Sequence, residues 1–281
     1  MRSISPRHAA VPSISPRHAT RRARTRLISA QVFLAILRRD VYVTGRELPV
    51  FLAQVGLQPL FLLFVFGKLL TQLGFARPGY ATLLFPGTIA ITAVLTGIQG
   101  IALPLAQEFS YTREVEDRLQ APLPTQLVAI EKLLFATLRA LLASGIMFLL
   151  GFLLLHIAPP PGKVPLIAAV VLLAALTGSA GGLVFGTLVP PNRIGLGFGL
   201  VLTPLIFTGC GQYPWASLVR LPWFQAATLL NPLTYASEGM RGLLDPPVPH
   251  MATWVCLLAL TGASAGLGSL GVWGFLRRAL G

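Results

Sequence analysis

The sequence predicts an all-helical integral membrane protein with six transmembrane helices. Three observations lead to this fold class: 54% of the 281 residues are hydrophobic, only 11% are charged, and the mean hydropathy is +0.73. A typical soluble domain carries about 25% charged residues, so this chain has too few charges to cover a water-exposed globule. Most of its surface is therefore expected to face lipid.

Six apolar stretches are long enough to cross a bilayer, which takes about 20 mostly apolar residues. They place helices near residues 49–70, 82–106, 131–156, 165–189, 194–212 and 252–275. Turn-forming clusters such as Pro159-Pro160-Pro161-Gly162 separate these helices. A seventh charge-free stretch, residues 221–237, has 17 residues and two prolines, so it is not expected to span the membrane.

The distribution of positive charge favours a membrane protein over a nucleic-acid-binding protein. The formal net charge is +13, and ten of the 22 Lys and Arg residues precede Pro49. With the N-terminus in the cytoplasm, sixteen cations fall on the cytoplasmic side and five on the other, with Arg139 inside the third span. Because cytoplasmic segments carry an excess of Lys and Arg, both termini are expected in the cytoplasm.

The chain before the first span is expected to have two parts. Residues 1–25 are predicted to be a disordered basic tail. Residues 26–47 are too charged to span but contain apolar residues such as Leu27, Ile28 and Val32, which suits an amphipathic helix in the inner membrane interface. A cytoplasmic extension of the first span is the alternative. Residues 48–278 form the predicted six-span transmembrane domain.

The longest predicted external segment, residues 213–250, contains a helix signal. Asn231 can cap a helix whose first residue is Pro232. The resulting short amphipathic helix, residues 232–244, would carry Glu238 and Arg241 as an i,i+3 pair.

Polar side chains recur on one face of two predicted spans. They are Gln54 and Gln58 in the first span and Thr88, Thr92, Thr96 and Gln99 in the second. Because polar groups in lipid need partners, interhelical hydrogen bonds are one explanation. A polar lining for a substrate path is the other. Arg139, two helical turns beyond Lys132, is expected to extend its side chain to the inner interface.

Glycines at four-residue spacing predict close helix contacts. Gly178, Gly182 and Gly186 share a face of the fourth span, and Gly262 and Gly266 share a face of the sixth. Contacts within the subunit are expected, with a seam between subunits as the alternative for one face.

The sequence contains no set of residues typical of catalysis. There is no Gly-x-x-x-x-Gly-Lys-[Ser/Thr] phosphate loop, and the four histidines are scattered, so neither an ATP site nor a metal site is expected. Cys210 and Cys256 lack metal-ligand spacing. They are read as buried thiols, with a disulfide open if both face an oxidising compartment.

The predicted cytoplasmic loop after the second span, residues 107–128, concentrates acids in an acid-poor chain. Its charged residues include Glu108, Arg113, Glu114, Glu116, Asp117 and Arg118. Two opposite-charge pairs at i,i+4 spacing would stiffen a helix here. A solvated charged loop and a lever that docks into another protein both fit this pattern.

Two segments resemble bacterial type-2 ABC export permeases, the relatives of drug-resistance and nodulation-factor exporters. The first runs from Arg113-Glu-Val-Glu-Asp-Arg118 to Pro122-Leu-Pro124, and the second is Leu230-Asn-Pro-Leu-Thr-Tyr-Ala-Ser-Glu-Gly-Met-Arg241. With six spans and an N-terminal interfacial helix, the resemblance covers roughly residues 26–278.

The resemblance implies a transport subunit of the bacterial inner membrane that is not itself an enzyme. It implies that two such permeases flank a route for lipidic, drug-like or glycoconjugate substrates. Two separate ABC ATPase subunits would bind ATP and Mg and would dock on residues 108–121, and the permease itself would hold no cofactor.

Two other function classes fit the sequence less well. An ion-coupled transporter or channel without an ATPase normally needs acids near the bilayer midplane, and none of the nine Asp and Glu residues lies in the middle of a predicted span. An integral-membrane enzyme would need convergent polar groups at one interface, and only Glu238, Arg241, Asp245 and His250 come close.

Overall fold

The structure is a computed structural model that describes residues 38, 39, 42, 45, 48–75, 79–108, 124–245 and 247–280. Within these ranges all the regular secondary structure is helical, without a strand. The predicted tail lies outside the described residues, as does the predicted interfacial helix apart from four isolated positions.

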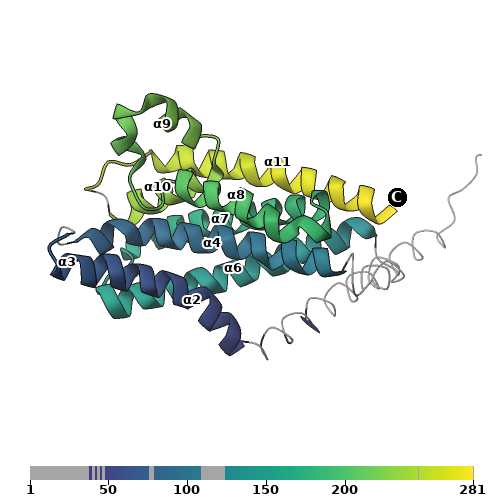
Figure 1. The fold of residues 1–281 in the computed structure, drawn as a ribbon, viewed down its shortest axis with the longest axis horizontal. Helices are drawn as coiled ribbons and strands as arrows, with labels where there is room; N and C mark the ends of the chain where they lie inside the picture. The colour runs from purple at the N-terminus through teal and green to yellow at the C-terminus, as the bar shows by residue number, and fades with distance from the viewer. Residues whose placement is uncertain are drawn as a thin grey trace, which may run out of the picture.

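Six long helices run side by side along the long axis of the molecule (Figure 1). They are α2 (Leu48–Phe64), α4 (Tyr80–Gln107), α6 (Thr125–Leu155), α7 (Val164–Leu188), α8 (Ile194–Thr208) and α11 (Thr253–Leu280). Each overlaps a predicted span, but the bounds differ in four of them: α2 ends six residues earlier, α6 begins six residues earlier, α8 ends four residues earlier and α11 ends five residues later than expected.

Short helices fill the connections. They are the π-helical turn η1 (Val65–Leu69) and α3 (Leu70–Gln72) after α2, the 3-10 turns η3 (Pro161–Lys163) and η4 (Pro191–Arg193), and η5 (Trp215–Arg220), α9 (Pro222–Thr228) and α10 (Pro232–Leu244) between α8 and α11. The short helix expected over residues 232–244 is thereby confirmed with its bounds.

Four helical segments of the described chain are long and apolar enough to cross a membrane. They are Tyr80–Gln107, Thr125–Leu155, Pro161–Leu188 and Thr253–Ala279. The apolar helices α2 and α8 have 17 and 15 residues and are shorter than these four segments. A multi-pass membrane protein is therefore established, whereas the count of six spans stays a prediction.

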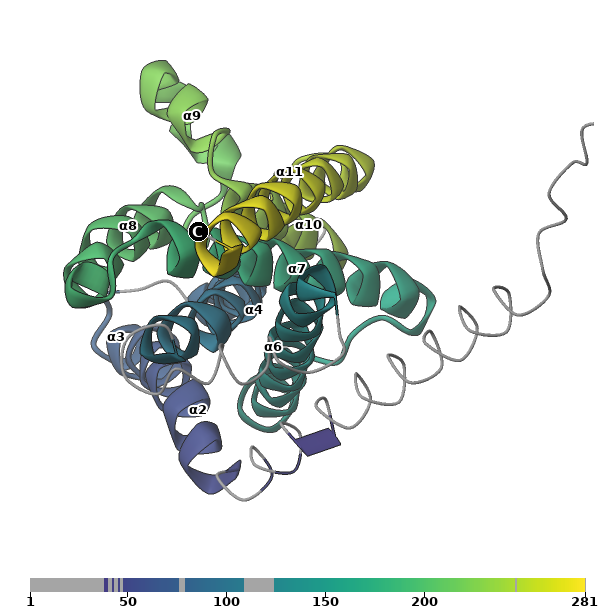
Figure 2. The same ribbon diagram turned by 90° about the vertical axis from the view of Figure 1, so that its right-hand side faces the viewer.

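The bundle is organised around α7, which packs against α4, α6, α10 and α11; Figure 2 shows it in the middle of the end-on view. Glycine explains how closely α7 and α4 approach. A Cβ atom on Gly178 would lie 2.3 Å from the Val94 carbonyl oxygen, and one on Gly182 would lie 2.5 Å from the Ile98 carbonyl oxygen. The predicted close-packing face of the fourth span is thus confirmed.

The corresponding prediction for the sixth span fails within the subunit. A Cβ atom added to Gly262 or Gly266 of α11 would meet no heavy atom of the described chain within 4 Å. Small residues permit close packing without requiring it, and α11 packs on α7 through other positions. A Cβ on Gly271, for example, would meet the Leu183 side chain at 3.0 Å.

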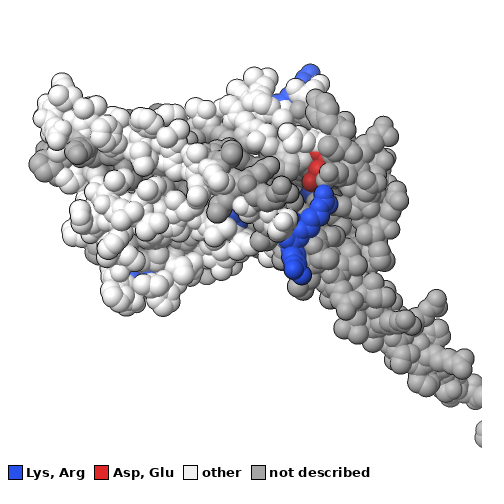
Figure 3. Space-filling model, turned by 90° about the horizontal axis from the view of Figure 1, so that it is seen from below, with Lys and Arg blue, Asp and Glu red and all other residues white. Residues whose placement is uncertain are grey.

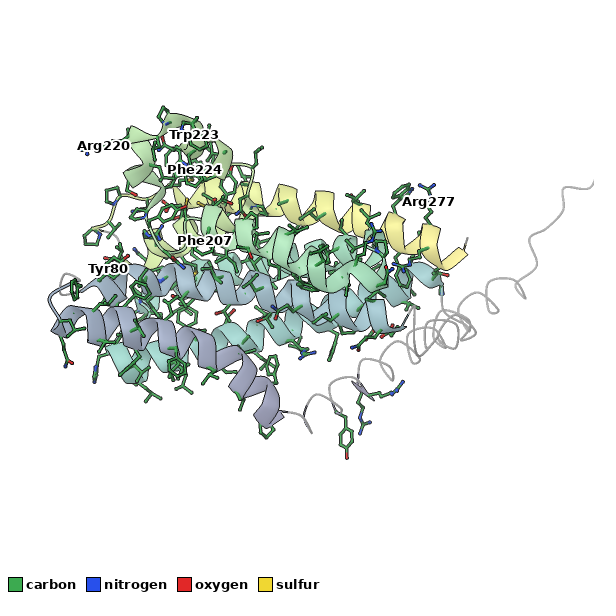
Figure 4. The ribbon with its side chains drawn as sticks, viewed as in Figure 1. Tyr80, Phe207, Arg220, Trp223, Phe224 and Arg277 are labelled. Atoms are coloured by element: carbon green, nitrogen blue, oxygen red, sulfur yellow. The ribbon has the colours of Figure 1, made fainter. Side chains whose placement is uncertain are left out.

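The exposed surface of the bundle is apolar. Seen from below, most of the described surface carries no Lys, Arg, Asp or Glu (Figure 3). Trp223 and Phe224 of α9 stand out at the end of the molecule opposite Arg277 of α11 (Figure 4), and Trp223 is 71% exposed. Trp and Tyr are enriched where a membrane meets water, so an exposed tryptophan at one end of the bundle suits an interfacial position.

Candidate functional site

The helix α10 lies inside the bundle. Its side chains Leu233, Ala236, Met240 and Leu243 are at most 3% exposed, and it packs against α4, α7 and α11. A short amphipathic helix was expected here, and the structure buries its polar face as well. Small residues, among them Ala236, Ser237 and Gly239, let the neighbouring helices close over its polar face as well, which sequence periodicity does not reveal. Its position on the external side stays a prediction.

The predicted pair Glu238 and Arg241 is the most deeply buried charged group in the described chain, with both side chains 0% exposed. Arg241 Nη1 donates to Glu238 Oε1, and Arg241 Nη2 donates to the Cys210 carbonyl oxygen at 2.9 Å. Glu238 also accepts the Trp215 N–H at 3.0 Å and the Met251 N–H at 3.2 Å. Buried charges are tolerated when they are paired and hydrogen-bonded in this way.

These contacts join three connecting segments to α10: the end of α8, the start of η5 and the approach to α11. The Glu238–Arg241 pair therefore anchors the backbone between α8 and α11 at three places, Cys210, Trp215 and Met251. The sequence alone does not identify Cys210, Trp215 and Met251 as partners of this ion pair. They bind it through backbone groups, which every residue has.

Asn231 caps α10 as predicted. Its Oδ1 accepts the Leu233 N–H at 2.9 Å. In addition, its Nδ2 donates to the Leu205 carbonyl oxygen at 2.7 Å and to Thr208 Oγ1 at 2.9 Å. The Asn231 side chain thus caps the start of α10 and also binds the last turn of α8. Pro232 occupies the first helical position, where the missing N–H of proline costs no hydrogen bond.

Replacing Asn231 with alanine is expected to lower the free energy of unfolding by about 2 kcal/mol, because both the cap and the two bonds to α8 are lost. Asn231→Ser is the matched control, since serine retains a capping oxygen but is too short to reach α8. Thermal unfolding of the purified variants should rank serine between alanine and wild type. A serine variant as unstable as the alanine variant would contradict the contribution of the cap.

A cleft of about 250 Å³ lies between α2, α4, α6 and α8. Its walls include all four polar residues predicted to share a face of the second span: Thr88, Thr92, Thr96 and Gln99. Gln54 and Gln58 belong to α2, but their side chains lie outside the described part of the structure. Thr88 Oγ1 donates to the Leu84 carbonyl oxygen of its own helix at 2.8 Å. Among the described residues, no hydrogen bond joins the side chains of Thr92, Thr96 or Gln99 to another helix. The stripe therefore lines a cavity, and both explanations of it stay predictions.

Arg139 of α6 also lines this cleft, and its guanidinium carbon lies 4.9 Å from the centre of the Phe51 ring of α2. The sequence suggested that this side chain extends to the inner interface. That ring is 4% exposed and belongs to the first turn of α2, so the expectation about the inner interface stays a prediction. The cation–π contact is favourable, and the sequence does not show it because 88 residues separate the two positions.

The cleft and the buried ion pair meet at the turn after α8. Arg241 holds the Cys210 carbonyl group, and the next residue, Gly211, touches α4 so closely that a Cβ on Gly87 would lie 1.8 Å from the Gly211 carbonyl oxygen. Gln212, one residue further, lines the cleft together with Thr88 of α4. The Glu238–Arg241 pair therefore positions one end of the cleft wall.

Most of the predicted docking loop lies outside the described residues, including Arg113, Glu114, Glu116, Asp117 and Arg118. Glu108 is described, and Lys132 Nζ of α6 lies 2.6 Å from each of its carboxylate oxygens. Both side chains of this ion pair are nearly buried, 12% and 10% exposed. The pair joins the two helices that lead into and out of the loop.

Phe51, Gln212 and Lys132 could not be assigned to these sites from the sequence, because nothing in their local pattern distinguishes them from other residues of their kind. Cys210 and Cys256 are both buried, and neither forms a disulfide bond. The expectation of two buried thiols is therefore confirmed.

An all-helical bundle with four helices long and apolar enough to cross a membrane, a cleft with polar residues between its helices and a buried ion pair defines the class of helical membrane proteins. The sequence model of the ABC-2 type transporter family matches residues 31–244, which is most of the chain. The chain therefore belongs to the ABC-2 type transporter family. It is also similar, with 28% identity over 220 residues, to a protein of Cyanophora paradoxa named "Putative transport permease ycf38". The match covers 75% of this chain and 73% of that protein.

The family assignment confirms the resemblance seen in the sequence. The protein is a multi-pass transport permease, and its part in transport is that of a membrane subunit and not of an enzyme.

Proposed function

We propose that this chain is the membrane-spanning permease subunit of an ATP-driven ABC exporter. Its cargo is a lipidic, drug-like or glycoconjugate molecule that moves outward across the bacterial inner membrane. The observation that carries this proposal is the cleft of about 250 Å³, where hydroxyl and amide groups gather between apolar helices of an ABC-2 family member. Binding sites for small molecules are typically concave and mostly apolar with a few polar groups.

ATP and Mg are bound and hydrolysed by two separate ABC ATPase subunits in this proposal, because the chain has no phosphate loop. The ATPases dock on the cytoplasmic loop, residues 108–121. The Glu108–Lys132 ion pair supports this role, since it ties the base of the loop to both α4 and α6. A displacement of the loop by the ATPase would thus reach two helices that line the cleft.

The proposed assembly contains a second copy of this chain or a relative, with six spans and both termini in the cytoplasm. For the first span, α2, η1 and α3 form one continuous helical stretch of 25 residues from Leu48 to Gln72, about 37 Å long and sufficient to cross a bilayer. The excess of cations in the segments assigned to the cytoplasm supports the orientation.

Replacing Glu114, Glu116 and Asp117 together with lysine is expected to abolish transport and to weaken binding of the partner ATPase about tenfold or more. The reason is that the loop would then carry positive charge and would repel an ATPase surface that is complementary to acidic side chains. The measurement is co-purification of the ATPase encoded in the neighbouring reading frame, alongside transport and the amount of permease in the membrane.

Membrane insertion should not change, because none of the three residues lies in a predicted span. Glu116→Ala alone is the control and should act weakly, since single charges at the rim of an interface contribute little. Wild-type ATPase binding together with wild-type transport in the triple variant would refute the docking surface.

A further inference from the structure

The cleft between α2, α4, α6 and α8 contains threonine hydroxyls that do not bond to their own helix. Six threonines within the long helices donate a hydrogen bond to the backbone carbonyl four residues earlier, which is the usual partner of a helical threonine. They are Thr88, Thr137, Thr177, Thr187, Thr208 and Thr261. Thr92 and Thr96 line the cleft, and their hydroxyls make no such bond and no other hydrogen bond within the described chain.

Thr92 is the most enclosed of these side chains. The residue is only 6% exposed, and it lines the cleft. A hydroxyl group in such a position costs free energy unless a partner satisfies it. The structure therefore leaves hydrogen-bonding capacity in the cleft for a ligand.

Two amides extend this capacity. Gln99 of α4 and Gln212, which follows α8, also line the cleft, and neither side chain makes a hydrogen bond within the described chain. The guanidinium of Arg139 already interacts within the protein, with the Phe51 ring among its partners. The groups left to recognise a ligand are thus hydroxyls and amides.

The donors and acceptors in the cleft restrict the chemistry of the ligand. A threonine hydroxyl and a glutamine amide each donate and accept hydrogen bonds. An ionised carboxylate only accepts and an ammonium group only donates, so either would leave part of the lining unsatisfied. A hydroxyl group both donates and accepts, and therefore matches every one of these side chains.

The arrangement of the polar groups favours a ligand with several hydroxyls. Thr88, Thr92, Thr96 and Gln99 follow one another on one face of α4, over about 16 Å along the helix. A ligand with a single hydroxyl would satisfy one of them. The facing walls are apolar, with Val55 of α2 and Ile206 of α8 among their residues, so they suit a hydrocarbon chain.

We propose that this cleft binds the polyhydroxyl head group of an amphiphile, a sugar ring carried on a hydrocarbon chain, and that Thr92, Thr96 and Gln99 bind its hydroxyl groups. The inference rests on the proposed transport function, because it takes the cleft as the place where cargo binds. It narrows the cargo from lipidic, drug-like or glycoconjugate molecules to amphiphiles with a sugar head group.

The test is lipid binding by the purified full chain in a polyoxyethylene detergent, which carries no sugar, followed by native mass spectrometry. The probes are glucosyl diacylglycerol and diacylglycerol with identical acyl chains, so that they differ only in the sugar ring. Wild type should bind the glucosyl lipid about tenfold more tightly. The double variant Thr92→Val/Thr96→Val should reduce this preference to about twofold or less, because valine keeps the shape of threonine without its hydroxyl.

The double variant Thr92→Ser/Thr96→Ser separates hydrogen bonding from packing. Serine keeps the hydroxyl and loses the methyl group, so the preference for the glucosyl lipid should stay near the wild-type value. If the two threonines served only to pack the helices, valine would be harmless and serine would not. Thr261→Val is the matched control, since Thr261 is exposed on α11 and does not line the cleft, and it should leave the preference unchanged.

Free glucose separates the sugar alone from the whole amphiphile, and should not displace the glucosyl lipid at equal concentration. Any one of four results would overturn the proposal: equal binding of the two lipids by wild type, an unchanged preference in the valine variant, a serine variant as unselective as the valine variant, or displacement by glucose. The assay needs no ATPase and measures no transport, so a failure here is distinct from a failure of the proposed exporter function.

Discussion

Arg241→Met is expected to destabilise the protein more than any other single change of a charged residue in the described chain. The substitution leaves Glu238 as a buried carboxylate without its cation and releases the Cys210 carbonyl group. Removing one partner of a buried ion pair costs about 3–5 kcal/mol, which corresponds to a fall in the melting temperature of about 5–10 °C for a chain of this length.

The two buried thiols provide the measurement. Both thiols are buried in the folded protein, so a thiol-reactive fluorophore reaches them only when the chain unfolds. Such a fluorophore should therefore report unfolding during a thermal ramp near neutral pH.

Arg220→Met is the control for the loss of positive charge, since Arg220 is exposed on η5; its melting temperature should change little. The double variant Glu238→Gln/Arg241→Met should recover part of the stability, because it removes the unpaired charge. A single Arg241→Met variant as stable as wild type would show that the pair does not hold the segments between α8 and α11.

Gly178→Ala is expected to cost about 3 kcal/mol, although alanine is the better helix former by about 1 kcal/mol. The added Cβ would lie 2.3 Å from the Val94 carbonyl oxygen and 2.8 Å from the Val94 Cα atom. These are backbone atoms that cannot rotate away, so α4 and α7 must separate. Because α4 carries the polar stripe of the cleft, transport should fall together with the melting temperature.

Gly266→Ala is the matched control on α11, where an added Cβ meets no described atom within 4 Å. It should be neutral or slightly stabilising within one subunit. If it destabilises the assembled transporter but not the separated subunit, the glycine face of α11 forms a seam between subunits. Equal melting temperatures for Gly178→Ala and wild type would contradict the tight α4–α7 contact.

The sequence by itself determined where the helices lie. Apolar runs of sufficient length, separated by prolines and glycines, located the six long helices, and the Asn231-Pro232 dipeptide located the start of α10. These are local properties, set by hydrophobic length, by the missing N–H of proline and by the capping oxygen of asparagine, so no knowledge of the neighbours was needed.

Only the tertiary structure decided which helix faces meet. In a membrane protein, lipid and protein interior are both apolar, so hydrophobic periodicity does not distinguish an outward face from a packed one. This is why equal glycine spacings gave a tight contact at Gly178 and none at Gly266. For the same reason α10 proved to be buried, and Thr88, Arg139 and Gln212, far apart in the chain, proved to line one cleft.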